Sequence, residues 1–200
     1  YQAVWAVEGD IQGCFDNISH RILLQKVWRM GIHDKRVLKI ISQMLKAGYI
    51  ERDLYHKTET GTPQGGILSP LLSNIYLNDF DWYVGRTYME PHRKCKHKCN
   101  DTRRMKWAGT TPKYNFRYAD DWVVLTSTEK EAFRMKRELT KYFRQKLKLE
   151  LSQEKTYVTD LRKGGIHFLG YIVKAERKRK TPDPATWTEH LVGKPLPDME

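Results

Sequence analysis

The chain has 200 residues, enough for one domain of moderate size or for part of a larger protein. A hydrophobic content of 40% can fill a core, which excludes a wholly disordered chain. No apolar run approaches the ~18 residues of a membrane span, and three cysteines, an odd number, argue against a disulfide framework and for a reducing compartment. The 36 Lys and Arg outnumber the 24 Asp and Glu, and the net charge of +12 favours a polyanionic partner, with nucleic acid first.

The first half of the chain predicts one strand and three helices. An apolar run over 3–7 predicts a buried strand that stops at Asp10. Capping residues and glycines then place three helices, at 20–30, 34–48 and 69–83. The second helix is expected to carry its apolar residues on one face: Val37, Leu38, Ile41 and Leu45. The polar stretch between the second and third helices is expected to be extended.

The second half predicts short strands around one long helix. A basic, loop-like stretch covers 85–113, and an amphipathic helix is expected over 129–148. The β-prone runs are expected as strands, at 115–118, 122–126, 156–160 and 166–173. The first two of these runs flank Ala-Asp-Asp and predict a hairpin. The last 27 residues are basic and then rich in proline, which is typical of a linker.

Three carboxylates are the strongest candidates for chemistry. Asp10 ends a predicted strand, and Asp120 and Asp121 lie at the tip of the predicted hairpin. Each acid alone is more typical of a solvated strand end or turn. Two adjacent acids between buried strands, however, repel each other unless a cation lies between them, and Mg²⁺ binds such carboxylates together with substrate phosphates. Two such ions about 4 Å apart would hold the attacking and leaving oxygens of a phosphoryl transfer.

Five sequence blocks occur in a characteristic order over residues 7–171. They are VEGDIQGCFDNISH from Val7, GTPQGGILSP from Gly61, FRYADDW from Phe116, LELSQEKT from Leu149 and FLGY from Phe168. In this order they resemble the first-aspartate motif, the PQG block, the YxDD motif, the lysine motif and the primer grip of reverse transcriptases. The resemblance is strongest to the group II intron-encoded reverse transcriptases, or maturases.

The resemblance implies an α+β fold, the right-hand polymerase palm with part of the fingers. An antiparallel sheet would carry the catalytic aspartates and pack on helices. Residues 1–15 and 67–173 would form the palm, 16–66 part of the fingers, and 174–200 a basic linker towards a thumb or maturase domain. The family's N-terminal blocks have no counterpart in these residues, so the resemblance does not imply that they polymerise alone.

The resemblance also implies a two-metal site. Asp10, Asp120 and Asp121 would hold two Mg²⁺ ions, for which Mn²⁺ can substitute, with the backbone of Ile11 as a further ligand. One ion would lower the pKa of the primer 3′-OH, and the other would bind the triphosphate. Lys155 would donate a proton to the departing pyrophosphate, although a lysine in so basic a chain is more often solvated.

The resemblance assigns further residues to the nucleotide and the primer. Phe15 would contact the sugar and select dNTPs by excluding a 2′-OH, with an ordinary core aromatic as the alternative. Ile11, Gln64 and Gly65 would complete the nucleotide site, although Pro-Gln-Gly-Gly also fits a tight turn. The primer grip would be formed by Phe168, Leu169, Gly170 and Tyr171, which also fit a strand with a glycine bulge.

A basic insertion over 86–106 contains a cluster of possible zinc ligands, His92, Cys95, His97 and Cys99. Its one-residue gaps do not match the usual spacing of zinc ligands, so zinc is not expected. Phosphate contacts with RNA are expected there instead, from Arg93, Lys94, Lys96, Lys98, Arg103 and Arg104.

The expected function is that of an RNA-directed DNA polymerase core of a group II intron protein. It would act on an RNA template with a DNA primer and dNTPs, and bind intron RNA in splicing. The alternatives are an RNA-binding splicing maturase with secondary or lost polymerase activity, and another bacterial reverse transcriptase such as a retron type. The intact acids favour catalysis. A bacterial cytoplasm is expected, with an organelle as the alternative; no membrane association is expected, and the oligomeric state, a dimer included, stays open.

Overall fold

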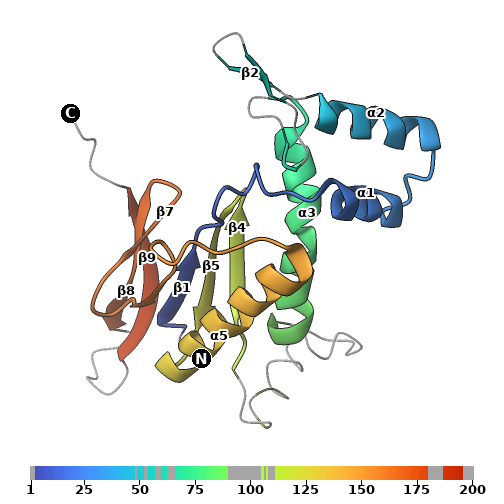
Figure 1. Cartoon of the computed structure of the whole chain (residues 1–200). Coiled ribbons are helices and arrows are strands. Elements are labelled where there is room, and N and C mark those ends of the chain that lie inside the picture. The colour runs from blue at the N-terminus through green and yellow to red at the C-terminus, as the bar shows by residue number, and fades with distance from the viewer. Residues whose placement is uncertain are drawn as a thin grey trace. The chain divides into compact units, whose positions relative to one another are not determined.

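The computed structural model describes residues 3–47, 49–51, 54–56, 60–62, 66–89, 105, 107, 111–179 and 187–195. The chain divides into two compact units (Figure 1). Unit 1 comprises Tyr1–Asp10, Trp82–Leu139 and Ser152–Glu200, and unit 2 comprises Ile11–Asp81 and Thr140–Leu151. Within the described ranges, none of the helices combines the length and the hydropathy that crossing a lipid bilayer requires.

A four-stranded antiparallel sheet forms the centre of unit 1 (Figure 1). Its order is β4 (Tyr114–Tyr118), β5 (Asp121–Thr126), β1 (Trp5–Gly9) and β6 (Tyr157–Asp160). Ala6 of β1 lies opposite Leu125 on one side and Thr159 on the other. The first strand of the chain therefore lies inside the sheet, between strands from its second half.

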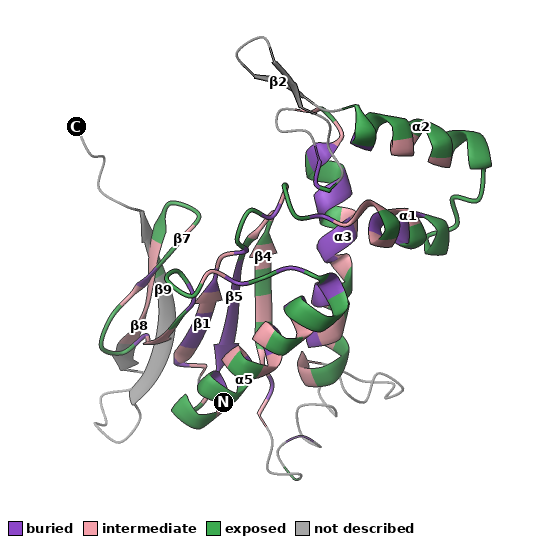
Figure 2. Cartoon of the chain, viewed as in Figure 1, coloured by how far each residue is buried: buried purple, intermediate pink, exposed green. Residues whose placement is uncertain are grey.

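The two central strands of this sheet, β1 and β5, are largely buried on both faces, and Figure 2 shows β5 buried along most of its length. Because side chains alternate along a strand, Ala6, Val123 and Leu125 share one face. They belong to a buried apolar cluster, Ala6, Val123, Leu125, Leu161 and Ile166. On the other face Val7 and Val124 are fully buried. Apolar runs at 3–7 and 122–126 are the expected signature of strands covered on both sides.

Helix α5 (Glu129–Tyr142) crosses in front of the sheet in Figure 1. It buries one face, Ala132, Met135 and Leu139, at helical spacing. Its start is a Thr-x-x-Glu capping box, in which Thr128 Oγ1 accepts the N–H of Glu131 at 3.3 Å. Lys136 Nζ donates to the carbonyl of Thr156 at 2.6 Å, which ties the helix to the start of β6. A π-helical turn, η2 (Phe143–Leu147), follows, so the helix expected over 129–148 is confirmed.

A second antiparallel sheet of unit 1 corrects two expectations. It consists of β7 (Ile166–Phe168), β8 (Tyr171–Arg179) and β9 (Trp187–Pro195). The single strand expected over 166–173 is a hairpin, and parts of the expected linker over 174–200 are strands. The turn is hidden in the sequence because one of its two positive-φ residues is a leucine, Leu169 at 52°, beside Gly170 at 77°. After the apolar start Tyr-Ile-Val, the rest of β8, Lys-Ala-Glu-Arg-Lys-Arg, is polar apart from Ala175, so no apolar alternation marks residues 174–179 as a strand.

Unit 2 contains the helices expected in the first half of the chain. They are α1 (His20–Arg29), α2 (Lys35–Lys46) and α3 (Ser69–Val84), whose last turn lies in unit 1. The extended stretch after α2 contains a hairpin of β2 (Tyr49–Glu51) and β3 (Leu54–His56). Ser19 caps α1 and Asp34 caps α2, with Asp34 accepting the N–H of Arg36 at 2.7 Å.

One expectation about the helices needs correction. The α2 face that carries Val37, Leu38, Ile41 and Leu45 forms as expected, with Leu45 buried and Val37 40% exposed. The stretch expected to be a loop from residue 85 begins instead as a π-helical turn, η1 (Gly85–Met89), that continues α3. This turn is held in unit 1 by Tyr88, whose hydroxyl hydrogen-bonds the carboxylate of Glu138.

Helix α3 is anchored in unit 2 through its aromatic residues. The Tyr76 hydroxyl donates to the carbonyl of Leu147 at 2.5 Å, and the ring of Phe80 packs on that of Phe143 at 4.9 Å. The buried amine of Lys26 donates to the Tyr76 carbonyl and lies 3.0 Å from a carboxylate oxygen of Asp79. Burial lowers the pKa of Lys26 because it disfavours the charged amine, and Asp79 partly opposes that shift.

Gly9 provides a direct test of the packing between β1 and β5. A Cβ at residue 9 would lie 2.3 Å from Cζ2 of the buried Trp122. We expect Gly9→Ala to lower the free energy of unfolding by about 1–3 kcal/mol, because the indole must move. Denaturant unfolding measures the change. Gly164→Ala is the matched control, since a Cβ there meets nothing within 4 Å. Equal losses in the two variants would contradict this packing.

Candidate active site

Three carboxylates come together at one end of the four-stranded sheet of unit 1. Asp10 directly follows β1, and Asp121 is the first residue of β5. Gly9 pairs with Trp122, so Asp10, which follows Gly9, and Asp121, which precedes Trp122, lie side by side. Asp120 completes the group from the β4–β5 turn. The structure thus brings together the three acids that the sequence singles out, and their catalytic roles stay predictions.

The turn that presents Asp120 is tight and strained. Tyr118 pairs directly with Asp121, which leaves only Ala119 and Asp120 between the strands. Ala119 has a φ of 53°, a left-handed backbone conformation that residues other than Gly, Asn and Asp rarely adopt. A guanidinium nitrogen of Arg117 donates to the Ala119 carbonyl at 2.7 Å and stabilises the turn. Arg117 is not among the residues that the sequence motifs single out, although a cation three residues before a pair of acids is a usable signal.

Electrostatic repulsion characterises the three acids. Burial raises the pKa of Asp121, and the neighbouring charges of Asp120 and Asp10 raise it further, while Lys155 opposes them. Repulsion of this kind disfavours bringing the three carboxylates into contact without a cation. Although the three acids lie at the same end of the sheet, no three His, Cys, Asp or Glu side chains among the described residues are grouped closely enough to hold a metal ion as they stand. The oxygen donors suit a hard divalent cation, but they must approach one another to bind it.

Lys155 lies beside Asp10, and its role as a proton donor stays a prediction. Its Nζ is 3.2 Å from a carboxylate oxygen of Asp10, and its side chain is 71% exposed. The loop that carries it is fixed to the sheet, because the N–H of Ser152 donates to the Asp10 carbonyl at 2.9 Å. Lys155 therefore neutralises part of the acidic cluster and is still exposed enough to move to another anion.

Glu8 is a further acid, on the sheet face that carries Ala6 and Val123, and the sequence motifs do not single it out. It lies two residues before Asp10 and opposite Val123, so its side chain points to the face that carries Ala6. Burial raises its pKa, while a hydrogen bond from Thr159 at 3.4 Å and the charge of His167 lower it. An acid inside an otherwise apolar strand was the available signal. Glu8 extends the negative field of the cluster along β1.

The residues assigned to the primer grip lie in the β7–β8 hairpin. Phe168 and Tyr171 pair across the turn formed by Leu169 and Gly170. Phe168 packs against the apolar cluster on the carboxylate-bearing face of the sheet. Leu169 and Tyr171 are about half exposed, at 47% and 51%. The hairpin is therefore anchored by one aromatic residue and leaves two apolar side chains open to a ligand.

Two residues assigned to the nucleotide site lie in unit 2. Ile11 is buried and bridges to Leu151, so only its backbone is available to a ligand. Phe15 is half-buried in the turn that follows, and its carbonyl accepts the N–H of Thr62 at 2.7 Å. Gly61, with a φ of 86°, is required there because a Cβ would lie 2.6 Å from the Asp16 carbonyl. These contacts attach the turn to the start of the PQG block.

Several predicted residues lie outside the described residues. They are Gln64 and Gly65, the His/Cys cluster His92, Cys95, His97 and Cys99, and the basic residues Arg93, Lys94, Lys96, Lys98, Arg103 and Arg104. Their assignments stay predictions.

The repulsion at Asp121 predicts a gain of stability on neutralisation. In chelator at neutral pH, we expect Asp121→Asn to raise the free energy of unfolding by up to about 1 kcal/mol. The folded pKa of Asp121 is raised, so this difference should shrink as the pH falls towards the ordinary value of about 4, where wild-type Asp121 is itself protonated. Denaturant unfolding over a pH series measures it. The exposed Glu154→Gln is the control; a destabilised Asp121→Asn at neutral pH would contradict the electrostatic account.

Comparison with known proteins identifies relatives of this chain. Residues 1–173 match the family described as reverse transcriptase (RNA-dependent DNA polymerase). The chain is 37% identical to the group II intron-encoded protein LtrA of Lactococcus lactis over 88% of its own length and 36% of that protein. It is 31% identical to a putative COX1/OXI3 intron 1 protein of Saccharomyces cerevisiae, over 96% of the chain and 26% of that protein. The chain thus spans about a third of LtrA, and less of the yeast protein.

Solved structures show the same fold. A telomerase from Candida albicans in complex with a TWJ fragment of telomeric RNA superposes with a TM-score of 0.59 at 14% identity, over 85% of this chain and 29% of that one. An apo telomerase from Candida tropicalis gives 0.59 at 13% identity, over 85% and 31%. These similarities confirm the expected α+β polymerase fold. With the family match extending over the acids, the lysine motif and the hairpin, the chain belongs to the reverse transcriptase (RNA-dependent DNA polymerase) family.

Proposed function

We propose that this chain is the central part of an RNA-directed DNA polymerase encoded by a group II intron. It would transfer a nucleotide from a dNTP to the 3′-OH of a primer paired with an RNA template. The observation that carries the proposal is the grouping of Asp10, Asp120 and Asp121 at one sheet end, with Lys155 at Asp10. The relatives named as intron proteins support the group II assignment.

The three carboxylates would hold two Mg²⁺ ions, for which Mn²⁺ can substitute. Bound there, the ions would activate the primer 3′-OH and neutralise the triphosphate. Asp10 would approach from β1 and the other two acids from the β4–β5 turn, which Arg117 keeps in place. Burial and the neighbouring charges of Asp120 and Asp10 raise the pKa of Asp121, and a bound cation would offset both effects.

Lys155 would serve as the proton donor to pyrophosphate. Its Nζ lies 3.2 Å from a carboxylate oxygen of Asp10. When Asp10 binds a cation instead, this exposed ammonium becomes available to the departing phosphate oxygens. Its position in the loop after Ser152, held at the Asp10 carbonyl, keeps it close to the acids throughout.

The surrounding elements would position the nucleic acid. The β7–β8 hairpin would contact the primer through Leu169 and Tyr171, and Phe15 would select the deoxyribose. Residues 1–15 and 67–173 would form the palm and 16–66 part of the fingers. Intron RNA, an RNA template with a DNA primer, and dNTPs are the proposed partners, and the charge of +12 fits them.

A splicing maturase with lost polymerase activity is the second candidate function. The same intron-protein relatives favour it. All three acids are present, which supports retained catalysis instead. A bacterial cytoplasm is the proposed location.

The carboxylates are tested most simply by neutral isosteres. In the full-length protein, Asp10→Asn or Asp120→Asn should reduce primer extension on an RNA template by about 10³-fold or more, because the cation site is lost. RNA affinity should stay within about twofold, because phosphate contacts by basic residues remain. Glu154→Gln, a neutralised acid of the nearby loop, should extend normally. Near-normal extension by either Asn variant would refute the assignment and favour the RNA-binding alternative.

The role of Phe15 is tested by the choice of sugar. Phe15→Val should lower the incorporation ratio of dNTP over rNTP by about tenfold or more, because a smaller side chain leaves room for the 2′-OH. Single-nucleotide incorporation with matched dNTP and rNTP measures the ratio. Phe133→Val, at a half-exposed phenylalanine of α5, is the control. A ratio equal to that of wild type would mean that Phe15 only packs in its turn.

A further inference from the structure

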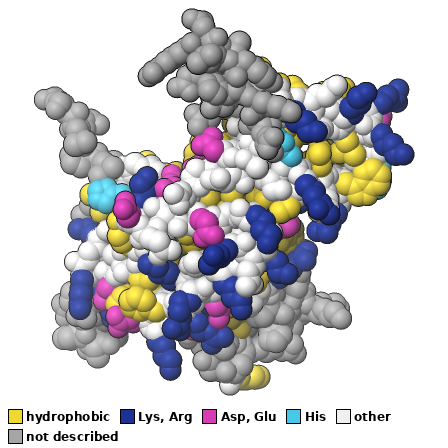
Figure 3. All heavy atoms as spheres, viewed as in Figure 1, with side chains coloured by type: hydrophobic (Ala, Val, Ile, Leu, Met, Phe, Trp, Pro, Cys, Tyr) yellow, Lys and Arg dark blue, Asp and Glu magenta, His cyan; other side chains and the backbone are white. Residues whose placement is uncertain are grey.

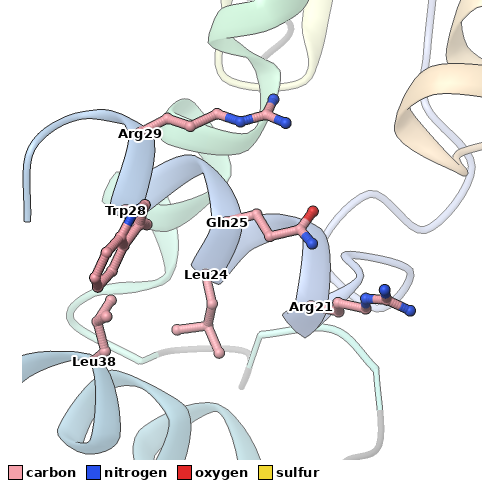
Figure 4. A pocket seen from close by; sticks show the side chains of 6 residues that line it. All are labelled: Arg21, Leu24, Gln25, Trp28, Arg29 and Leu38. Carbon is pink, nitrogen blue, oxygen red and sulfur yellow. The ribbon is translucent and has the colours of Figure 1, made fainter. Parts of the chain in front are cut away.

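Helices α1 and α2 of unit 2 line a pocket of about 490 Å³ that is open to solvent (Figure 4). Its lining residues are Arg21, Leu24, Gln25, Trp28, Arg29 and Leu38. In Figure 4, Leu24 and Trp28 of α1 lie near Leu38 of α2, while Arg21 and Arg29 extend away from this apolar group at either end of α1. The pocket therefore has an apolar centre and a cation on each side.

Trp28 is the distinctive side chain of this pocket. It is 44% exposed, although indoles are usually well buried. Its ring is supported by His33, with the two ring centroids 4.4 Å apart. Met30 and Ile32 beside it are exposed as well, at 59% and 39%. An indole fixed from one side and open to solvent is a preformed stacking platform.

The helical hairpin around Trp28 is strongly basic. Between His20 and Ala47 it carries seven Lys and Arg against one acid, Asp34, a net charge of +6. Lys26 is buried with Asp79, and Arg36 pairs with Asp34. Arg36 is exposed too, and so are the other five cations: Arg21, Arg29, Lys35, Lys39 and Lys46. Figure 3 shows Lys and Arg side chains around an apolar area over these helices.

An exposed indole between two guanidiniums matches the chemistry of a single-stranded nucleic acid. A base can stack on the ring, the flanking phosphates can pair with the guanidiniums, and an amide such as that of Gln25 can hydrogen-bond a base edge. An uncharged apolar partner would gain nothing from a charge of +6. A duplex would keep its bases stacked and could use only the cations.

We propose that the Trp28 pocket binds an unpaired base of single-stranded RNA, with Arg21 and Arg29 on the adjacent phosphates. The choice of RNA over DNA rests on the proposed function, whereas the binding itself needs none of the three carboxylates. The pocket provides the protein with an RNA-binding site apart from the nucleotidyl-transfer site. It also adds base stacking to the phosphate contacts that the charge of the chain provides.

Paired substitutions at Trp28 separate stacking from packing. Trp28→Phe keeps an aromatic face, and Trp28→Leu keeps only an apolar side chain against Leu24 and Leu38. With a labelled 20-nucleotide single-stranded RNA of mixed sequence, the full chain carrying Trp28→Leu should bind about 5- to 150-fold more weakly than wild type. Trp28→Phe should retain most of the affinity. Binding of a blunt RNA duplex should change less than about twofold in both.

A charge series tests the phosphate contacts independently. Arg21→Gln and Arg29→Gln should each flatten the slope of log K against log salt by about 0.7 for the single strand. Arg36→Gln is the matched control, because it removes the same charge from the same hairpin at a guanidinium paired with Asp34. Its slope should stay close to that of wild type. These surface substitutions leave the packing of Trp28 intact.

Three results would overturn the proposal. The first is equal RNA affinity of the Trp28→Phe and Trp28→Leu variants, and the second is an equal loss of affinity for single-stranded and duplex RNA. The third is a Trp28→Leu variant that changes only the oligomeric state measured by sedimentation, which would assign the pocket to a second copy of the chain. Asp120→Asn should keep the Trp28-dependent affinity. The proposed polymerase activity and the proposed pocket can therefore fail separately.

Discussion

The pairing of β1 with β5 is the constraint on which the candidate site depends. It places Gly9 opposite Trp122 and thereby brings Asp10 next to Asp121, two residues far apart in the sequence. The absence of a side chain at Gly9 lets the indole lie against the strand. Both faces of the sheet are buried at this point, so the register is fixed by packing on both sides. A slip by one residue would move the acids away from each other.

The electrostatics of the site follow from this geometry. Asp10 after β1, Asp120 in the turn and Asp121 at the start of β5 repel one another, and Lys155 pairs with Asp10. This unfavourable charge arrangement is thus built by the end of β1, the start of β5 and the turn before it. A divalent cation would relieve the repulsion and release the lysine in the same event. This coupling connects the stability of the sheet end to the proposed chemistry.

Much of this organisation could be predicted from the sequence. The apolar runs before Asp10 and after Asp121 identify buried strands, and capping residues identify the helices. The order of five motifs identifies the family. The β7–β8 turn was missed because Leu169 adopts a conformation that usually signals glycine. The second half of β8 was missed because residues 174–179 are polar apart from Ala175, and β9 was missed because the residues around it are rich in proline. Glu8, Arg117 and the Trp28 pocket depend on contacts that spacing alone does not reveal.

The central claim is that Asp10, Asp120 and Asp121 form one cation site once a divalent ion is present. Titration with Mn²⁺, followed by the loss of its free electron-paramagnetic-resonance signal, tests the claim without requiring polymerisation. We expect the wild-type chain to bind Mn²⁺ and the Asp10→Asn chain to bind it at least about tenfold more weakly, although Asp10 comes from a different strand than the other two acids. Equal Mn²⁺ affinity in the two proteins would contradict the claim that β1 and the β4–β5 turn build a common site.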